Sequence, residues 1–118
     1  MKLAVVGSRC FEDAALLART LKLARPSHVI SGGALGADIM AENWAKARKI
    51  PVTIFKPEWG RYGYSAGAIR NRLIVDAADK VIAFWDGKSP GTKITMDYAR
   101  KAGKVVEVIQ FKTQEMQV

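Results

Sequence analysis

The stretch Ile-Ser-Gly-Gly-Ala-Leu-Gly-Ala-Asp, residues 30–38, decides how the rest of the chain is organised. It follows a short apolar run at 28–31 and opens onto a helical pattern. Three glycines in five residues, Gly32, Gly33 and Gly36, remove side chains where the backbone must bend. Successive backbone N–H groups are then free to face an anion, and the positive end of the next helix points to the same place. We therefore predict a strand, a phosphate-binding loop and the start of a helix.

Outward from this stretch, short apolar runs alternate with helical patterns. We expect strands at about 2–6, 28–31, 52–55, 80–85 and 104–111, and helices at about 13–24, 37–47, 65–77 and 91–102. The runs are almost continuously apolar, which is typical of parallel strands covered on both faces. Right-handed crossovers then predict one α/β domain over residues 1–111, a Rossmann-like, doubly wound parallel sheet of five strands in the order 3-2-1-4-5 with helices on both faces. Residues 112–118 are expected to form a polar C-terminal tail.

Local patterns predict which side chains face inward and which residues end the helices. The expected inward residues are Leu17, Leu21 and Ala24 in the first helix, Ile39, Met40 and Trp44 in the second, and Ile69, Leu73 and Ala77 in the third. Asp13 and Ser65 are candidate caps. Asp97 is spaced to pair with Lys93 and Lys101 on one helix.

Composition narrows the class of protein. The 118 residues are 49% hydrophobic and 25% charged, as in an ordinary globular domain. No apolar run is long enough to cross a membrane and no signal-peptide pattern precedes the first strand, so we expect a cytoplasmic protein. A single cysteine, Cys10, and a single histidine, His28, make a metal site improbable, and no separate cofactor is expected. The net charge of +8 favours either simple solubility or an anionic ligand.

Three small-residue loops are expected to converge beyond the carboxyl ends of the strands, where open parallel sheets bind ligands. These loops follow the first, second and fourth strands. An Arg-Asn pair of the third helix is expected to face the same crevice. The predicted ligand-binding residues are Gly7, Ser8, Arg9, Ser31, Gly32, Gly33, Gly36, Asp38, Arg70, Asn71, Asp86, Gly87, Ser89, Gly91 and Thr92.

Several of these residues have two interpretations. Arg9 can fork onto a phosphate or carboxylate, or pair at the surface with Glu12 or Asp13. Asp38 can be a first-turn residue favoured by the helix dipole, or can accept a hydrogen bond from a ribose hydroxyl. The loop 86–92 leads into a helix N-terminus and is either a second anion-binding loop or a plain connection.

The loop at 56–64 carries an aromatic and basic group, Trp59, Arg61, Tyr62 and Tyr64. It can stack a base of the ligand, or it can form a small satellite core.

Cys10 lies next to the crevice, but His28 begins the second strand at the opposite end of the sheet. A Cys–His catalytic pair is therefore disfavoured.

These motifs resemble those of the SLOG superfamily, the Rossmann-like group that includes DNA-processing protein A and the LOG phosphoribohydrolases, and the YspA-like branch in particular. The resemblance extends over about residues 5–108. It rests on Gly7-Ser8-Arg9, residues 31–38, Ala66-Gly67 with Arg70-Asn71, and residues 83–87 with Ser89 and Gly91-Thr92.

The resemblance implies a nucleotide-related ligand, often in a dimer. LOG enzymes cleave the glycosidic bond of nucleoside monophosphates with an arginine, which Arg70 matches, and a glutamate just after a Gly-Thr loop. Here Gly91-Thr92 is followed by Lys93-Ile94-Thr95, so that glutamate is missing. In DNA-processing protein A the corresponding region binds single-stranded DNA, and Arg70-Asn71-Arg72 resembles its Arg-Asn-Arg.

The sequence thus favours a module that senses or sequesters a nucleotide or nucleotide-derived, phosphate-bearing ligand without catalysis. One alternative is a LOG-type phosphoribohydrolase, a nucleotide N-glycosidase, with Arg70 and Asp86 as its catalytic residues. The other is a single-stranded DNA binder, favoured by the net charge. Chain length and exposed helix faces allow a homodimer or higher homo-oligomer, and no membrane partner is expected.

Overall fold

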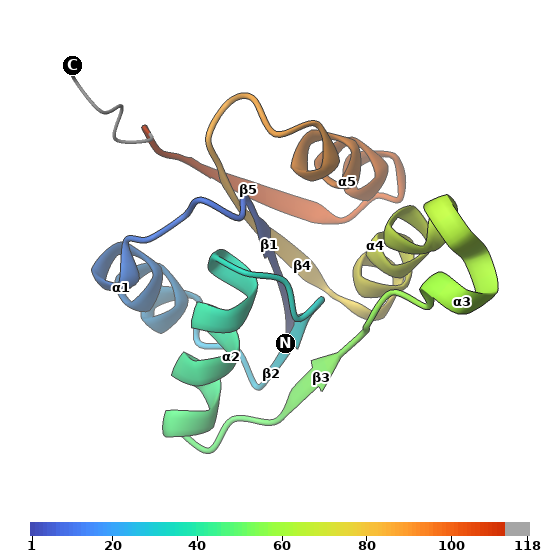
Figure 1. The fold of residues 1–118 in the computed structure, drawn as a ribbon. Coiled ribbons are helices and arrows are strands. Elements are labelled where there is room, and N and C mark those ends of the chain that lie inside the picture. Colours follow the sequence, from blue (N-terminus) through green and yellow to red (C-terminus); the bar gives the residue numbers. More distant parts are fainter. Residues whose placement is uncertain (113–118) are drawn as a thin grey trace.

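Five parallel strands form the centre of the computed structural model, which describes residues 1–112 (Figure 1). They are β1 (Lys2–Gly7), β2 (His28–Ser31), β3 (Val52–Ile54), β4 (Lys80–Trp85) and β5 (Val105–Gln110). The strand order is β3-β2-β1-β4-β5 and every pairing is parallel. The predicted α/β class and strand order are confirmed. The predicted tail lies, from residue 113 onward, outside the described residues.

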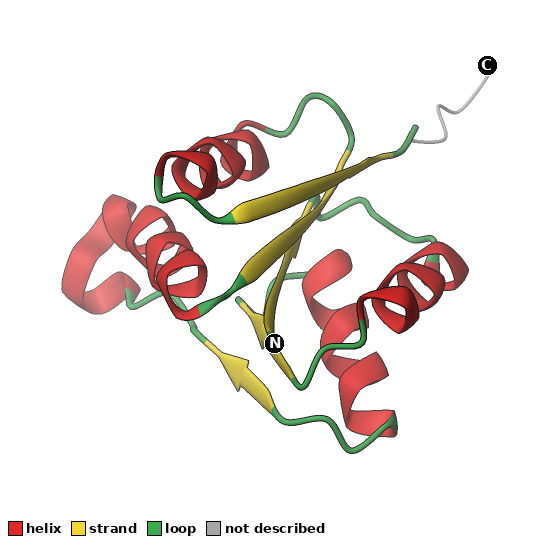
Figure 2. Cartoon of the chain, turned by 180° about the vertical axis from the view of Figure 1, so that it is seen from behind, coloured by secondary structure: helices red, strands yellow, loops and turns green. Residues whose placement is uncertain are grey.

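Helices cover both faces of the sheet. The helices are α1 (Ala14–Ala24), α2 (Ala37–Ala47), α3 (Trp59–Tyr62), α4 (Ala66–Ala77) and α5 (Pro90–Lys101). Figure 1 shows α1 and α2 on one side of the sheet and α4 and α5 on the other, and Figure 2 shows the same layers from behind. The four long helices and the five strands lie within a residue of the expected bounds.

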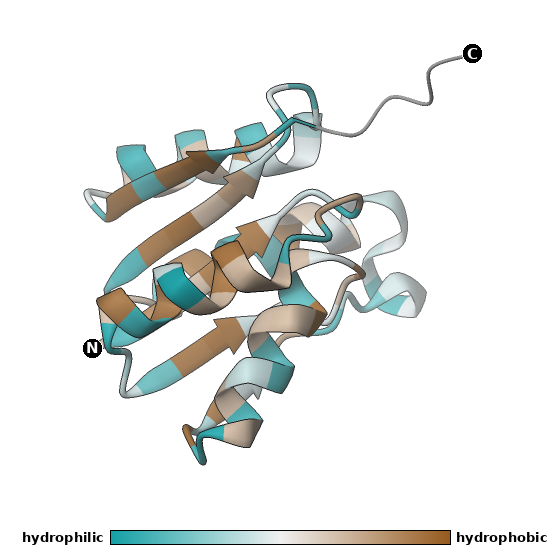
Figure 3. Cartoon of the chain, turned by 90° about the vertical axis from the view of Figure 1, so that its left-hand side faces the viewer, coloured by the Kyte–Doolittle hydropathy of each residue, from teal (hydrophilic) through white to brown (hydrophobic). Residues whose placement is uncertain are grey.

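The alternation of side chains along the buried strands creates two separate cores. In β1, Leu3 and Val5 pack with the residues of α1 and α2, whereas Ala4 and Val6 pack with those of α4 and α5. All four side chains are buried, so the strand needs apolar residues at every position. In Figure 3 the strands are accordingly among the most hydrophobic segments of the chain, while teal residues gather on the helices.

The buried faces of α2 and α4 match the expected ones only in part, since Trp44 is buried as expected and Met40 and Ala77 pack partly buried against the cores. In α2 the inward stripe consists of Ala37, Ala41 and Ala45 with Trp44, and Ile39 is 36% exposed. In α4 Ile74 and Val75 are buried with Ala66, and Leu73 is 48% exposed. Both helices carry apolar residues on more than one side, so periodicity alone could not select the face.

The rotation of α4 matters for the site. Arg70 lies one helical turn before the buried Ile74, so its side chain starts from the inward face of the helix. The expected stripe, with Ile69 and Leu73 inward, would have placed it on a flank.

Three local predictions have mixed outcomes. The cap at Asp13 is confirmed, because its carboxylate accepts a hydrogen bond from Leu16 N at 3.0 Å. Ser65 is not a side-chain cap, because the 3-10 turn η1 (Gly63–Ser65) runs directly into α4. The loop expected at 56–64 instead contains α3 and the start of η1.

No helix within residues 1–112 combines the length and the apolar character that crossing a bilayer requires.

Core burial can be tested on α1 with two leucines of opposite exposure. Leu21 is fully buried, and Leu23 is 80% exposed. We expect Leu21→Ala to lower the free energy of unfolding by about 2–5 kcal/mol, because it removes buried methylene groups and leaves a cavity. Leu23→Ala should change it by no more than about 0.5 kcal/mol. Urea unfolding followed by circular dichroism measures both, and equal effects would contradict the assigned helix face.

Candidate functional site

A cleft of about 530 Å³ lies beyond the carboxyl end of β1, between residues of α4 and α5. This is the edge of the sheet where the winding reverses between β1 and β4, the usual ligand position in such folds. Predicted site residues that line it are Gly7, Ser8, Arg9, Asp38, Arg70, Asn71, Ser89, Gly91 and Thr92. The other predicted site residues do not line the cleft: Ser31, Gly32, Gly33, Gly36, Asp86 and Gly87.

The glycine loop after β2 is organised by the buried carboxylate of Asp38. Its Oδ2 accepts hydrogen bonds from Gly32 N at 3.1 Å and from Ala34 N at 3.3 Å. Gly33 N donates to Ser31 Oγ at 3.3 Å. These three N–H groups are therefore satisfied within the protein and are not free to face an anion, contrary to the expectation from the sequence.

Arg70 ties the same loop to helix α4. Its Nη1 donates to Gly32 O at 2.6 Å, and its Nε donates to Asn71 Oδ1 at 2.8 Å. A side chain at position 32 would collide with this guanidinium, which gives Gly32 a steric reason to be glycine. Nη2 takes part in none of the hydrogen bonds found within residues 1–112, and Arg70 is among the residues that line the cleft.

A second buried carboxylate, Glu42, binds the residue at the start of the glycine loop, Ser31, and was not predicted from the sequence. Ser31 Oγ donates to Glu42 Oε2 at 2.6 Å, and both residues are buried. Glu42 lies four residues after Asp38 on α2. That spacing on one helix face, combined with small neighbours, is the signal that could have revealed it.

The pKa of the Asp38 carboxyl is shifted by its surroundings. Burial raises the pKa of Asp38 to about 6, although the hydrogen bond from Ala34 N, the positive charge of Arg70 and the hydrogen bond from Gly32 N act against it. Burial also lowers the pKa of Arg70; the negative charge of Asp38 acts against this, and the positive charge of Arg9 adds to the lowering. Both guanidinium groups belong to residues that line the cleft.

Close approach of two loops depends on Gly36. Its φ of +83° is a conformation that residues with side chains rarely adopt. A Cβ there would also lie 2.5 Å from Ser8 O and 2.8 Å from Arg9 O. The loop after β2 therefore packs directly on the loop after β1.

Asp86 closes the third loop. Its Oδ1 accepts hydrogen bonds from Lys88 N at 2.9 Å and Ser89 N at 2.7 Å, and its Oδ2 lies 2.9 Å from Ser89 Oγ. Ser8 joins the group, since its Oγ accepts from Asp86 N at 3.3 Å and lies 2.9 Å from Ser89 Oγ. Partial burial raises the pKa of Asp86, but the hydrogen bonds from Ser89 and Lys88 outweigh it and lower the pKa to about 2.

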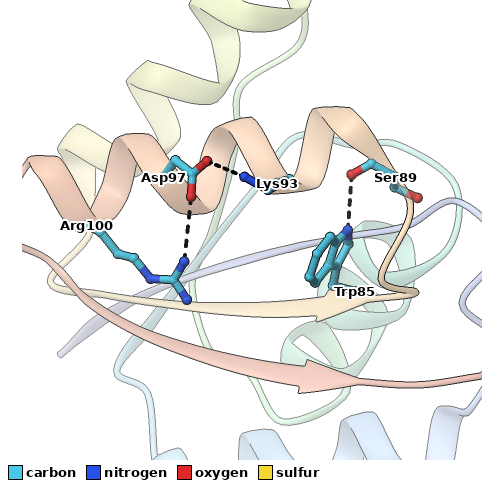
Figure 4. A network of polar contacts seen from close by, with 5 residues as sticks. All are labelled: Trp85, Ser89, Lys93, Asp97 and Arg100. Carbon is cyan, nitrogen blue, oxygen red and sulfur yellow. Dashed lines mark hydrogen bonds and ion pairs between the residues drawn. The ribbon is translucent and has the colours of Figure 1, made fainter.

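The loop between β4 and α5 places the N-terminus of α5 at the cleft. Trp85 Nε1 donates to Ser89 O at 3.1 Å, which holds the loop against the end of β4 (Figure 4). The first N–H groups of a helix have no carbonyl partner within it. Those of Gly91 and Thr92 belong to residues that line the cleft, and no hydrogen bond found in the described part of the chain engages them.

The outer side of α5 is a separate, solvated surface. Asp97 pairs with Lys93 at 3.0 Å and with Arg100 at 3.6 Å (Figure 4). The expected partner Lys93 is confirmed, and Arg100 rather than Lys101 is the second partner. Asp97 is thus a surface residue of an ion-pair network and does not line the cleft.

Cys10 and His28 do not form a catalytic pair. Cys10 lines the cleft, and its Sγ lies 3.7 Å from Asp86 Oδ2. Burial and the negative charge of Asp86 raise the pKa of the thiol, which makes it a poor nucleophile. The His28 ring instead bonds Thr53 Oγ1 at 2.6 Å, near the other end of the strands.

The raised pKa of Asp38 predicts a pH-dependent stability. The folded protein keeps the Asp38 proton up to about pH 6, whereas the unfolded chain releases it near pH 4. The free energy of unfolding should therefore fall as the pH rises from about 4 to about 6, by at most about 3 kcal/mol from this residue. The Asp38→Asn variant should not show this pH-dependent fall in the free energy of unfolding, because an amide does not titrate. It should keep the loop in place, because the N–H groups of Gly32 and Ala34 donate to one oxygen that an amide also has. Chemical unfolding at pH 4 and pH 7 compares the two proteins, and identical pH dependence would contradict the shift.

The sequence is similar to one protein family and to a phage protein. The model of the YspA, cpYpsA-related SLOG family matches residues 1–62. The gene 61 protein of Mycobacterium phage D29 is 35% identical, over 91% of this chain and 93% of that protein.

Solved structures similar to this fold include DNA processing protein A from two bacteria. The Helicobacter pylori protein matches with a TM-score of 0.73 and 23% identity, covering 98% of this chain and 67% of its own. The Streptococcus pneumoniae protein matches with a TM-score of 0.80 and 22% identity, and this chain spans about half of its length, 52%. The fold is thus shared with these proteins, and the family match identifies the chain as a member of the YspA, cpYpsA-related SLOG family.

Proposed function

We propose that the chain binds a nucleotide or a nucleotide-derived, phosphate-bearing ligand in this cleft, and that it senses or sequesters the ligand without converting it. One observation carries the proposal: two guanidinium groups, Arg9 and Arg70, line the cleft, and neither is in an ion pair within residues 1–112. The carboxylate of Asp38 attracts Arg70 in part, and an anion bound in the cleft would further reduce the repulsion between the two guanidinium groups.

Further features support an anionic ligand of nucleotide size. The N–H groups at the start of α5 supply donors and the positive end of a helix dipole. The volume of about 530 Å³ lies within the range usual for small-molecule sites. The anion would thus bind to Arg9, Arg70 and the N-terminus of α5 rather than to the N–H groups of the glycine loop.

Two observations favour binding over hydrolysis. The position of the LOG glutamate is occupied by the segment 93–95, which has no carboxylate. Asp86, the other candidate catalytic residue, does not line the cleft, and both of its oxygens accept hydrogen bonds from its own loop. Release of free base or ribose phosphate from nucleotides by the wild-type protein would instead support the phosphoribohydrolase alternative.

Calorimetry with a panel of nucleoside mono- and diphosphates and ADP-ribose tests the proposal. Arg9 is exposed, so Arg9→Ala should leave the fold intact. The loss of a charged hydrogen bond, worth about 1.5–3 kcal/mol, should weaken binding about 10- to 100-fold.

Arg19→Ala is the matched control, because it removes the same charge from an exposed position of α1 outside the cleft. It should bind like the wild type. Absence of binding to every phosphate-bearing ligand, or equal effects of the two variants, would overturn the proposal.

Single-stranded DNA is a second candidate ligand, favoured by one comparison. The similar Helicobacter pylori structure is of a protein described as binding single-stranded DNA, and this chain carries a net charge of +8. However, Arg70 and Arg72 diverge here, because Arg70 bonds the glycine loop whereas Arg72 lies 5.7 Å from the ring of Tyr98.

Salt dependence separates the two ligands. Binding of single-stranded DNA through several phosphates should weaken steeply with salt, with a slope of log K against log [salt] of about −0.7 for each phosphate contacted. We expect binding of an oligothymidine to the wild-type protein to be weak, and nucleotide binding to depend on salt only shallowly. A steep slope with tight binding at physiological salt would favour DNA as the ligand.

A further inference from the structure

We propose that Trp59 forms a nucleobase subsite of the cleft, so that the preferred ligand carries an aromatic base and is not a bare sugar phosphate. This inference rests on the proposed function and adds to it a residue and a chemical class of ligand.

Trp59 is unusual among the three tryptophans of the chain. It lines the cleft, yet 58% of it is exposed. Trp44 is 8% exposed within the core, and Trp85 donates its indole N–H to Ser89. The Trp59 indole takes part in no hydrogen bond or aromatic pair found within residues 1–112. A large aromatic surface left open on the wall of a cleft is suited to stacking against a planar group.

Trp59 also lines the same cleft as the two arginines and contacts the helix that carries Arg70. A Cβ built at Gly67 would be 3.7 Å from Trp59 Cη2, so the indole edge lies over the first turn of α4. Gly67 and Arg70 are three residues apart on this helix and both line the cleft. The indole edge thus lies against the helix that carries Arg70, near the residue three positions before it. A nucleotide has the same order of groups, with an anion at one end, a sugar between and a base at the other.

Part of the lining of the same cleft is apolar. Gly67 and Ala68 of α4 line the cleft without polar side chains, and Ile94 of α5 lines it with 64% of its surface exposed. Apolar walls with a few polar groups are typical of sites for ligands with an aromatic part.

The neighbouring aromatic residues do not offer the same surface. Arg61 covers the ring of Tyr62, with its Cζ 5.0 Å from the ring centroid. Tyr64 is fully exposed and does not line the cleft. Of the aromatic residues at 59–64, Trp59 is the one that lines the cleft.

Calorimetric titration of adenosine monophosphate and ribose 5-phosphate tests the subsite, because the two ligands share the phosphate and the ribose. Stacking of a base on an aromatic side chain contributes about 1–3 kcal/mol, so the wild type should bind adenosine monophosphate about 5- to 100-fold more tightly than ribose 5-phosphate. Trp59→Ala should reduce this preference to less than about threefold, and Trp59→Phe should keep much of it, since a ring remains. Tyr64→Ala is the matched control and should keep all of it.

The outcomes separate this inference from the function on which it rests. If both ligands bind the wild type equally, or if Trp59→Ala keeps the preference, the subsite is wrong although the phosphate site stands. If neither these ligands nor the wider panel bind the wild type, the proposed function is wrong and the subsite is wrong with it. Quenching of tryptophan fluorescence by adenosine monophosphate in the wild type, lost in Trp59→Phe, is the expected spectroscopic sign.

Discussion

The buried carboxylate of Asp38 is the constraint on which the cleft depends. One of its oxygens accepts hydrogen bonds from the N–H groups of Gly32 and Ala34, and Arg70 donates a hydrogen bond to the carbonyl of Gly32. The glycine loop is thereby held between helices α2 and α4, which lie on opposite faces of the sheet (Figure 1). Burying the carboxylate is costly, and the hydrogen bonds and the nearby guanidinium offset part of that cost.

This arrangement explains why the electropositive groups of the cleft are not those of the glycine loop itself. The N–H groups of the glycine loop donate hydrogen bonds to the side chains of Asp38 and Ser31. The donors that are open to a ligand therefore come from Arg9, Arg70 and the N-terminus of α5. Asp86 has a similar organising part in the loop before α5, where it binds the N–H groups of Lys88 and Ser89. In both loops a carboxylate binds backbone N–H groups, and within residues 1–112 neither Arg9 nor Arg70 forms an ion pair.

The fold could be predicted almost completely because its signals are local and repeat along the chain. Continuous apolar strands such as residues 80–85 need cover on both faces, and the intervening helices can supply it only in a parallel, doubly wound sheet. The inward faces of α2 and α4 could not be predicted in the same way. Ile39 and Leu73 are as apolar as the residues that are buried, and burial is decided by which side of the helix meets the sheet.

By itself, the sequence determined the architecture and the edge of the sheet where the small-residue loops and Arg9 collect. Only the tertiary structure decided which polar groups there are satisfied and which are open. The reason is that the deciding hydrogen bonds join residues far apart in the chain, Arg70 with Gly32 and Ser8 with Asp86. Such pairs leave no periodic trace in the sequence, so the loop at 30–38 could be recognised as a wall of the site but not as one whose own N–H groups are already bound.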